Sequence, residues 1–389
     1  MLNRNWNYPT SIWFGVGRIN DLAKACQQLG MKNPLFVTDE GLVSNSITEQ
    51  ALSVLKKNAI PHTVYSNVQG NPTGDNVEKG VLHYKKHQHD GVIAFGGGSA
   101  IDAAKTIAFM SGQTKSVWDF EDVGDNWLAA DVNGIAPIVA VPTTSGTGSE
   151  VGRASVILDE ANHTKKLIFH PKMLPGLVIS DPELTVGLPP HITAWTGVDA
   201  MVHAIEAYCA PGYHPMADGI AIEAIKLIAE NLPKAFKNGK DIEARGHMLV
   251  AASMGATAFQ KGLGSVHSVA HQLGAIYNKQ HGLLNAIILP YALKQNADAI
   301  EERMQYLSMV LGLPSSGTEA VIQYILDLKK ALNIPHSLAE IDITDANAET
   351  IGTMAFKDPS TPTNAKPVTN KDLENLFRAA VNGDFSLVA

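Results

Sequence analysis

The chain has 389 residues, 45% of them hydrophobic and 17% charged, which is long and apolar enough for two separate cores. Its formal net charge of −8 argues against a nucleic-acid partner, because binding a phosphate backbone requires a basic surface. The only two cysteines, Cys26 and Cys209, fit neither a disulfide framework nor a cysteine-based zinc site, and this favours a reducing compartment.

The sequence carries no evident targeting or membrane signal. Residues 1–15 lack the continuous apolar core of a signal peptide. No stretch approaches the roughly 20 uninterrupted apolar residues of a membrane-spanning helix. We therefore expect a cytoplasmic protein with no membrane partner.

The first half of the chain alternates short apolar runs with amphipathic segments. The apolar runs predict strands, the last of them leading into a polar loop, at residues 34–41, 62–68, 91–99 and 136–150. The amphipathic segments between them predict helices at residues 47–58, 76–87 and 101–112. This alternation indicates an α/β, Rossmann-like domain with a mostly parallel sheet, whose ligands bind beyond the carboxyl ends of the strands.

The second half has a different pattern, with apolar residues at helical spacing and no strand-like alternation. Helices are predicted at residues 192–210, 218–236, 243–259, 297–312 and 317–332. The turn-rich segment 181–191 separates the two patterns. We therefore expect an α/β domain over residues 1–187 and an all-helical domain over residues 188–389.

A glycine-rich turn, GGGS at residues 96–99, joins a predicted strand to a predicted helix. Glycines let backbone N–H groups approach a phosphate, and the helix N-terminus supplies partial positive charge. The alternative is a tight turn without a ligand. The nearest match to the G-x-G-x-x-G pattern, residues 15–20, ends in Asn and follows a weak strand, so we interpret it as a turn.

Two further features favour a dinucleotide. Asp39 ends a strong apolar strand, where a carboxylate can bind adenosine ribose hydroxyls and repel a 2′-phosphate, which favours NAD over NADP. A helix-capping role for Asp39 is equally compatible with its position. The loop PTTSGTGSE, residues 142–150, offers hydroxyls and glycines to phosphate or nicotinamide; taken alone, it is a flexible loop.

One carboxylate and three imidazoles form a complete ligand set for a borderline divalent metal: Asp199, His203, His267 and His281. Asp199 and His203 are four residues apart, so they share one helix face. His267 and His271 repeat that spacing, which gives one candidate more than a tetrahedral site needs. His271 is therefore either a proton relay facing the substrate or a partner of a ligand.

The remaining candidates carry less information. Glu206, one helical turn beyond His203, is expected to be structural or to contact a ligand. Trp118, Phe259 and residues 357–369 are candidates to line a pocket. We expect surface or loop positions for the histidines without paired context: His62, His83, His87, His89, His163, His170, His191, His214 and His247.

Several motifs occur in an order that resembles one known family. The motifs are GGGSAIDAAK, PTTSGTGSEV, DPELT, TGVDAMVHAIEAY and HSVAHQLGAIYNKQHG, and the resemblance runs from about residue 9 to the C-terminus. The chain resembles the iron-containing (type III) alcohol dehydrogenases. This resemblance implies a dehydroquinate-synthase-like architecture, with the metal in a cleft between a dinucleotide domain and a helical domain.

The resemblance also implies roles for individual residues. The metal ligands would be Asp199, His203, His267 and His281, binding Fe(II) or sometimes zinc, and His271 would lie near substrate and nicotinamide. The residues implied to surround NAD, with Asp39 at the adenosine ribose, are Asp39, Asn71, Gly97, Gly98, Ser99, Asp102, Thr143, Thr144, Lys165 and Leu184. One departure is Ser268-Val269, where many members carry Ala-Met.

The function implied is NAD-linked interconversion of a small primary alcohol or diol and its aldehyde, in a homodimer or higher homo-oligomer. Three alternatives stay open. A metallohydrolase would use metal-activated water, with GGGS as a structural turn. A lyase of the dehydroquinate-synthase type would need a basic cluster for a phosphorylated substrate, and none is evident. A non-catalytic metal- or nucleotide-binding protein is the third.

Overall fold

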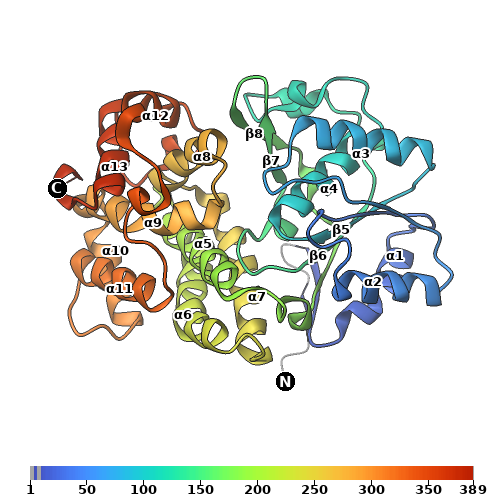
Figure 1. Ribbon diagram of the computed structural model, residues 1–389, viewed down its shortest axis with the longest axis horizontal. Coiled ribbons are helices and arrows are strands. Elements are labelled where there is room, and N and C mark those ends of the chain that lie inside the picture. Colours follow the sequence, from blue (N-terminus) through green and yellow to red (C-terminus); the bar gives the residue numbers. More distant parts are fainter. Residues whose placement is uncertain (1–3, 7–9, 389) are drawn as a thin grey trace. The chain divides into compact units, whose positions relative to one another are not determined.

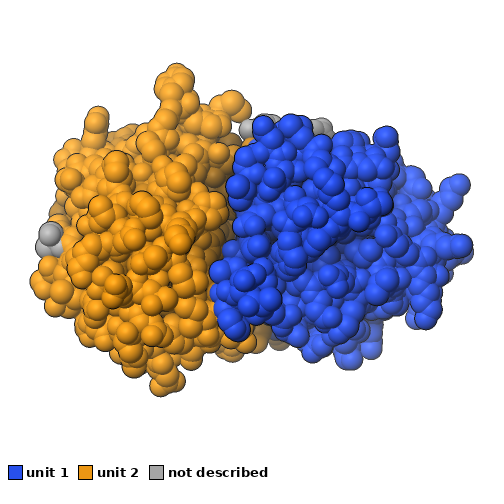
Figure 2. Space-filling view, turned by 90° about the horizontal axis from the view of Figure 1, so that it is seen from above, with its two compact units in different colours: residues 1–187 blue, residues 188–389 orange. Residues whose placement is uncertain are grey.

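The computed structural model describes residues 4–6 and 10–388; residues 1–3, 7–9 and 389 lie outside it, among them part of the amino-terminal segment considered for a signal peptide. The chain divides into two compact units, residues 1–187 and residues 188–389 (Figure 2). We call them the N-terminal unit and the C-terminal unit and describe each by itself.

The N-terminal unit contains a seven-stranded sheet in the order β1-β2-β9-β6-β5-β3-β4. All neighbouring strands are parallel except β1 and β2. The mostly parallel α/β fold predicted from the sequence is confirmed. The strands are β1 (Arg4–Trp6), β2 (Ser11–Phe14), β3 (Leu35–Val37), β4 (Thr63–Tyr65), β5 (Val92–Gly96), β6 (Ile138–Pro142) and β9 (Leu177–Ser180).

Four α-helices accompany this sheet (Figure 1): α1 (Leu22–Gln28), α2 (Ser46–Lys57), α3 (Gly74–Lys86) and α4 (Gly98–Met110). Every second strand residue, such as Phe36, Ile93 and Val139, belongs to one core cluster with side chains of α1 and α2. The predicted helices are confirmed as α2, α3 and α4. The starts of α2 and α3 are set by local caps, since Asn45 accepts the Ile47 N–H and Thr73 accepts the Asn76 N–H.

The sequence did not predict β9 or a separate two-stranded antiparallel ribbon, β7 (Ala154–Asp159) and β8 (Thr164–Phe169). Only Ile168 of β8 is buried, so the strand lacks the apolar alternation that would identify it. The segment at residues 15–20 is a turn, as expected: Gly17 adopts a left-handed conformation and precedes a short 3₁₀ helix.

All regular secondary structure in the described residues of the C-terminal unit is helical, as predicted. Its α-helices are α5 (Pro190–Cys209), α6 (Pro215–Lys237), α7 (Ile242–Ala258), α8 (Ser265–Tyr277), α9 (His281–Gln295), α10 (Ala297–Val310), α11 (Thr318–Ala331), α12 (Ala348–Phe356) and α13 (Asn370–Asn382). In the described part of the whole chain, no helix combines the length and apolar character needed to cross a bilayer.

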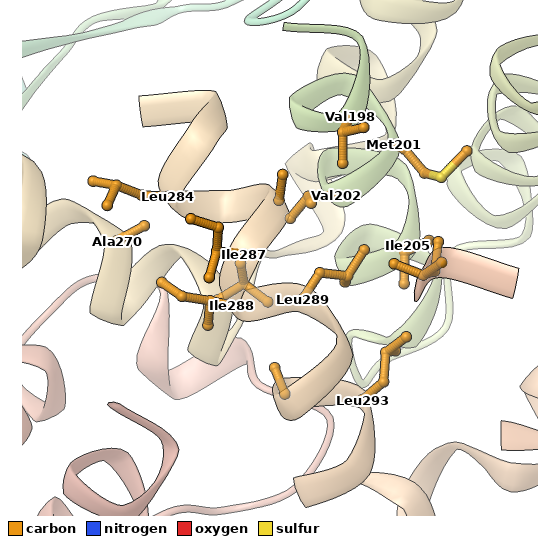
Figure 3. Packing of buried hydrophobic residues seen from close by; sticks show 14 of the residues in the cluster. Val198, Met201, Val202, Ile205, Ala270, Leu284, Ile287, Ile288, Leu289 and Leu293 are labelled. Carbon is orange, nitrogen blue, oxygen red and sulfur yellow. The ribbon is translucent and has the colours of Figure 1, made fainter. Parts of the chain in front are cut away.

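The core of this unit holds α5 against α9 (Figure 3). Val198, Val202 and Ile205 of α5 are almost fully buried in the same cluster as Ile287 and Leu289 of α9. Their spacing of three and four residues places them on one side of α5. This apolar contact fixes the rotation of α5 about its own axis and so determines where its neighbouring polar stripe points.

Two histidines expected at surface or loop positions lie in loops, as expected, but their side chains are buried. His89 is 6% exposed, and its Nε2 lies 2.7 Å from the Thr63 hydroxyl, which also lies 2.8 Å from Nε2 of His83. His170 is 3% exposed and accepts the Lys172 N–H. The contacts of His89 join segments that are far apart in the sequence, so single-residue context could not reveal its burial.

A buried lysine makes the stability of the C-terminal unit depend on pH. Lys329 of α11 donates to the carbonyls of Ile287 (3.5 Å) and His336 (3.3 Å), and its burial lowers its pKa to about 7. Between that value and its ordinary pKa of 10.5, only the unfolded chain keeps the proton, so this lysine makes stability rise with pH.

We expect Lys329→Met to remove that contribution and to raise the free energy of unfolding at pH 6 by on the order of 2 kcal/mol, because the desolvation cost of a buried ammonium group is removed. Urea unfolding of wild type and variant at pH 6, 8 and 10 measures it. The difference in free energy of unfolding between the variant and wild type should shrink as pH rises. A difference that stays constant would contradict this account.

Candidate metal and dinucleotide sites

Helix α5 carries a polar stripe beside its apolar one. Asp199, His203 and Glu206 are four and then three residues apart, so they share one face of the helix. All three side chains are buried. Because buried polar groups are costly unless they are paired or bind a ligand, this stripe requires partners from other helices.

The partners come from α8 and α9. His267 lies in the first turn of α8, and His281 is the first residue of α9. A glycine allows α9 to begin directly against α5: a Cβ on Gly282 would lie 2.4 Å from the Trp195 carbonyl oxygen and 3.0 Å from the Asp199 Cβ. The missing side chain at position 282 therefore brings His281 up to Asp199.

The four predicted ligands converge. One ligand atom from each of Asp199, His203, His267 and His281 lies within 4.8 Å of the other three. Asp199 Oδ1 is 3.9 Å from Nε2 of His203 and 3.8 Å from Nε2 of His281. Ligands at bond lengths of about 2.1 Å in a tetrahedral site are about 3.4 Å apart, so a divalent cation fits with a small contraction.

The contacts of Asn285 support the fit. Its Nδ2 lies 2.7 Å from Asp199 Oδ1, 3.0 Å from His281 Nε2 and 3.2 Å from His267 Nε2. An amide nitrogen has two hydrogens and cannot satisfy three acceptors. In the tautomers that carry the proton on Nδ1, both ring nitrogens offer a lone pair, and three electron-pair donors then converge on one point. Burial, with His203 and His271 nearby, lowers the pKa of His267 well below its usual value, so its imidazole is neutral as coordination requires.

Glu206 contacts one of the four side chains. Its Oε2 lies 2.6 Å from His267 Nδ1, and its Oε1 accepts the Val266 N–H at 2.8 Å. Burial raises the pKa of Glu206 to about 7, while hydrogen bonds from backbone N–H groups oppose that rise. The sequence left open whether Glu206 is structural or contacts a ligand; in the structure it contacts His267, one of the predicted ligands.

His271 is not part of the four-residue cluster. Its Nδ1 lies 2.9 Å from Asp358 Oδ2, and its ring stacks on His281 with centroids 5.4 Å apart. Asp358 is itself held by the Gln272 side chain and by the Ser360 N–H. Asp358 was not recognised in the sequence, because it is 87 positions from His271 and belongs to a segment singled out only as a candidate pocket wall.

The glycine-rich turn has the geometry a phosphate requires. Gly96 has φ +146°, which favours glycine, and a Cβ there would lie 2.7 Å from the Ala100 Cβ. Gly97 is the N-cap of α4, which begins with no side-chain cap and no acidic residue in its first turn. The first N–H groups of α4 are therefore available to an anion.

The loop after β6 packs on these glycines. A Cβ on Gly97 would lie 3.3 Å from Thr144 Cγ2, and a Cβ on Gly98 would lie 2.4 Å from Thr147 Oγ1. The Thr143 N–H donates to the Gly96 carbonyl at 2.9 Å. Glycine at positions 97 and 98 thus also has a structural role, because the absence of side chains allows the loops after β5 and β6 to pack together.

Two more predicted cofactor residues border this turn. Asp39 follows β3, and a Cβ on Gly96 would lie 3.3 Å from its Oδ2. Its Oδ1 also accepts the Leu42 N–H at 3.0 Å, so it caps a turn, and burial raises its pKa. Ser99 donates to the Gly70 carbonyl, which brings the segment containing Asn71 to the start of α4.

Three predicted cofactor residues have other surroundings. Asp102 accepts the Ser149 hydroxyl and the Val156 N–H, and Lys105 lies 3.4 Å from it. Leu184 is buried in the core of the N-terminal unit, and Lys165 lies on β8. Of the candidate pocket residues, Trp118 packs on Gly74 and Phe259 on His203.

A strand-end turn open to phosphate in one unit and a carboxylate with three imidazoles in the other are features of a metal- and dinucleotide-dependent oxidoreductase. Comparison with known families agrees. Residues 9–182 match the iron-containing alcohol dehydrogenase model, and residues 193–381 match the C-terminal model of the Fe-containing alcohol dehydrogenase family. The chain belongs to the iron-containing alcohol dehydrogenase family.

Similar proteins span nearly the full chain. A 4-hydroxybutyrate dehydrogenase of Cupriavidus necator is 35% identical, covering 96% of this chain and 99% of the relative. An NAD-dependent methanol dehydrogenase of Bacillus methanolicus is 34% identical, covering 97% and 100%. The structure of an alcohol dehydrogenase from Oenococcus oeni aligns with TM-score 0.89 at 33% identity, covering 95% and 97%.

These matches confirm, at the level of the family, the predicted fold class, the alcohol dehydrogenase activity, and iron and NAD as cofactors. They give no support to the metallohydrolase or lyase alternatives.

The contact at Gly282 predicts a local sensitivity. We expect Gly282→Ala to lower the free energy of unfolding by about 1–3 kcal/mol, because the added methyl overlaps the backbone of α5. Gly219→Ala in α6 is the matched control, since nothing lies within 4 Å of its Cβ position; it should raise stability by up to about 1 kcal/mol. Equal effects in urea unfolding would show that the contact does not constrain the fold.

Proposed function

We propose that this chain is an NAD-linked dehydrogenase that interconverts a small primary alcohol or diol and its aldehyde at one divalent metal ion. The observation that carries this proposal is the convergence of four donor atoms, from Asp199, His203, His267 and His281, within 4.8 Å. We infer that these four side chains are the metal ligands. Family membership favours Fe(II), while zinc suits the same nitrogen and oxygen donors.

A metal at this site would act as a Lewis acid toward the alcohol oxygen, and NAD would accept the hydride. The chain's own residues supply orientation. The contact between α5 and Gly282 holds Asp199 beside His281, and Glu206 holds the His267 ring. Asp199, His203 and His267 are buried and His281 is half-buried, so water has limited access to the ligand atoms.

His271 is the proposed proton relay. The Asp358 carboxylate accepts from its Nδ1, which orients the ring and leaves Nε2 to exchange a proton with the substrate or solvent. Its side chain is 15% exposed, so a proton can reach it. His267, four residues earlier on α8, is buried and is one of the four proposed metal ligands.

For the cofactor, we infer that the first turn of α4, including Gly97, Gly98 and Ser99, binds the pyrophosphate of NAD. Asp39 at the end of β3 would accept from the adenosine ribose. The loop with Thr143 and Thr144 would contact phosphate or nicotinamide. Four further residues complete the proposed surroundings of NAD, and each of them also has partners within the protein: Asn71, Asp102, Lys165 and Leu184.

Residues 1–187 would then be the dinucleotide-binding domain and residues 188–389 the metal-binding domain. We further propose a cytoplasmic homodimer or larger homo-oligomer. Cys26 and Cys209 are free thiols, and burial raises the pKa of each to about 12, so they remain protonated, which suits a reducing compartment.

The relatives act on different short substrates: one is named for methanol and another for 4-hydroxybutyrate. We therefore propose that the substrate is a small primary alcohol. A panel of primary alcohols, diols and aldehydes, followed by NADH absorbance with the iron-loaded and the zinc-loaded protein, tests this. A chain that is inactive with every member in both directions would contradict the proposal.

Asp39 should set the choice between cofactors. We expect Asp39→Asn to raise kcat/KM with NADP on the order of tenfold, about 1.4 kcal/mol, because a negative charge facing the 2′-phosphate is removed. Asn retains an oxygen for the Leu42 N–H, so the turn should persist. Glu40→Gln, at an exposed neighbouring carboxylate, should leave the NAD to NADP ratio unchanged.

The two histidines of α8 should separate metal binding from proton transfer. We expect His267→Ala to abolish both metal content and turnover, and His271→Ala to keep the metal while slowing turnover by roughly 10²–10⁴-fold. Elemental analysis of protein purified without air or chelator gives the metal content. A His267→Ala protein with full metal and full activity would refute the ligand assignment.

A further inference from the structure

We propose that Glu206 is a positioning residue that holds His267 in the one tautomer able to bind a metal, and that it thereby sets the metal affinity of the site. This inference rests on the proposed function, in which His267 is a ligand. Nothing in the family match or in the names of the relatives assigns a role to this carboxylate.

The geometry fixes the direction of the hydrogen bond. Glu206 Oε2 lies 2.6 Å from His267 Nδ1, and both side chains are buried. In its ionised form the Glu206 carboxylate can only accept, and Nδ1 then donates. The lone pair of the imidazole is then on Nε2, the atom that lies 3.2 Å from Asn285 Nδ2 and faces Asp199 and His281.

The carboxylate is itself immobilised. Its Oε1 accepts the Val266 N–H at 2.8 Å, at the positive N-terminal end of α8. A Cβ on Gly264 would lie 3.0 Å from Oε1, so a glycine at that position leaves room for the carboxylate. Glu206 therefore joins α5, which carries Asp199 and His203, to the first turn of α8, which carries His267.

A purely structural role as a cap of α8 is the competing explanation, and the chain contains a matched control for it. Asn364 Oδ1 accepts the Ser265 N–H at 3.0 Å, so it caps the same helix end. No contact joins Asn364 to His267 among the interactions of the described residues. Loss of a cap alone should therefore act similarly at both positions.

The Glu206→Gln variant separates the two roles. The amide oxygen of Gln can still accept the Val266 N–H and so keep the cap. The amide nitrogen then faces His267 Nδ1 as a donor, which forces the ring proton onto Nε2 and occupies the atom that should bind the metal. The opposite amide orientation would direct the NH₂ group at the Val266 N–H.

The experiment titrates metal-free wild type, Glu206→Gln and Asn364→Ala with Co(II) and Zn(II) against a competing chelator, and records the Co(II) absorption spectrum. We expect Glu206→Gln to bind about 10–100-fold more weakly with an altered spectrum, while the melting temperature of its metal-free form stays near wild type. Asn364→Ala should lower the melting temperature and leave the affinity for Co(II) near wild type.

Two results would overturn the proposal: wild-type affinity and spectrum in Glu206→Gln, or losses of affinity in both variants that follow their losses of stability. A second measurement does not depend on how a variant folds. In metal-free wild type labelled with ¹⁵N-histidine, His267 should carry its proton on Nδ1, and a proton on Nε2 would refute the inference. Failure of wild type to bind either metal would instead refute the proposed function.

Discussion

The C-terminal unit depends on one close contact, the approach of the first turn of α9 to the backbone of α5 at Gly282. The apolar stripe of α5 packs on α9 and fixes its rotation, so Asp199 and His203 point to the side where His281 begins the next helix. Helix α8 adds His267, and Glu206 connects that helix back to α5. The buried Asp199, His203 and His267 and the half-buried His281 are thereby brought together from three helices, an arrangement that a cation would stabilise.

The N-terminal unit presents a different kind of site, built from backbone rather than side chains. Three glycines and the uncapped start of α4 supply N–H groups, and loops that follow neighbouring strands pack around them. This design suits a phosphate, whereas the buried imidazoles of the other unit suit a metal. Under the proposed function, each unit would hold one of the two groups that hydride transfer from an alcohol requires.

The sequence predicted what depends on local periodicity. The spacing of Asp199 and His203 placed them on one helix face, and the strand-to-helix alternation predicted the parallel sheet. The same spacing at His267 and His271 could not show that only the first joins the cluster, because Asp358, 87 positions away, holds the second. Likewise β8 and the buried His89 depend on neighbours distant in sequence. The role of Gly282 becomes apparent only from the structure, because a Cβ at this position would overlap the Trp195 carbonyl oxygen.

The most direct test of this account is X-ray absorption spectroscopy of protein purified without air and loaded with one equivalent of Fe(II) or Zn(II). The account predicts one tightly bound metal per chain, with three imidazole nitrogens and at least one carboxylate oxygen at about 2.0–2.2 Å. Loss of one imidazole is expected in each of the variants His203→Ala and His281→Ala. A sulfur ligand, or a spectrum unchanged by both substitutions, would contradict it.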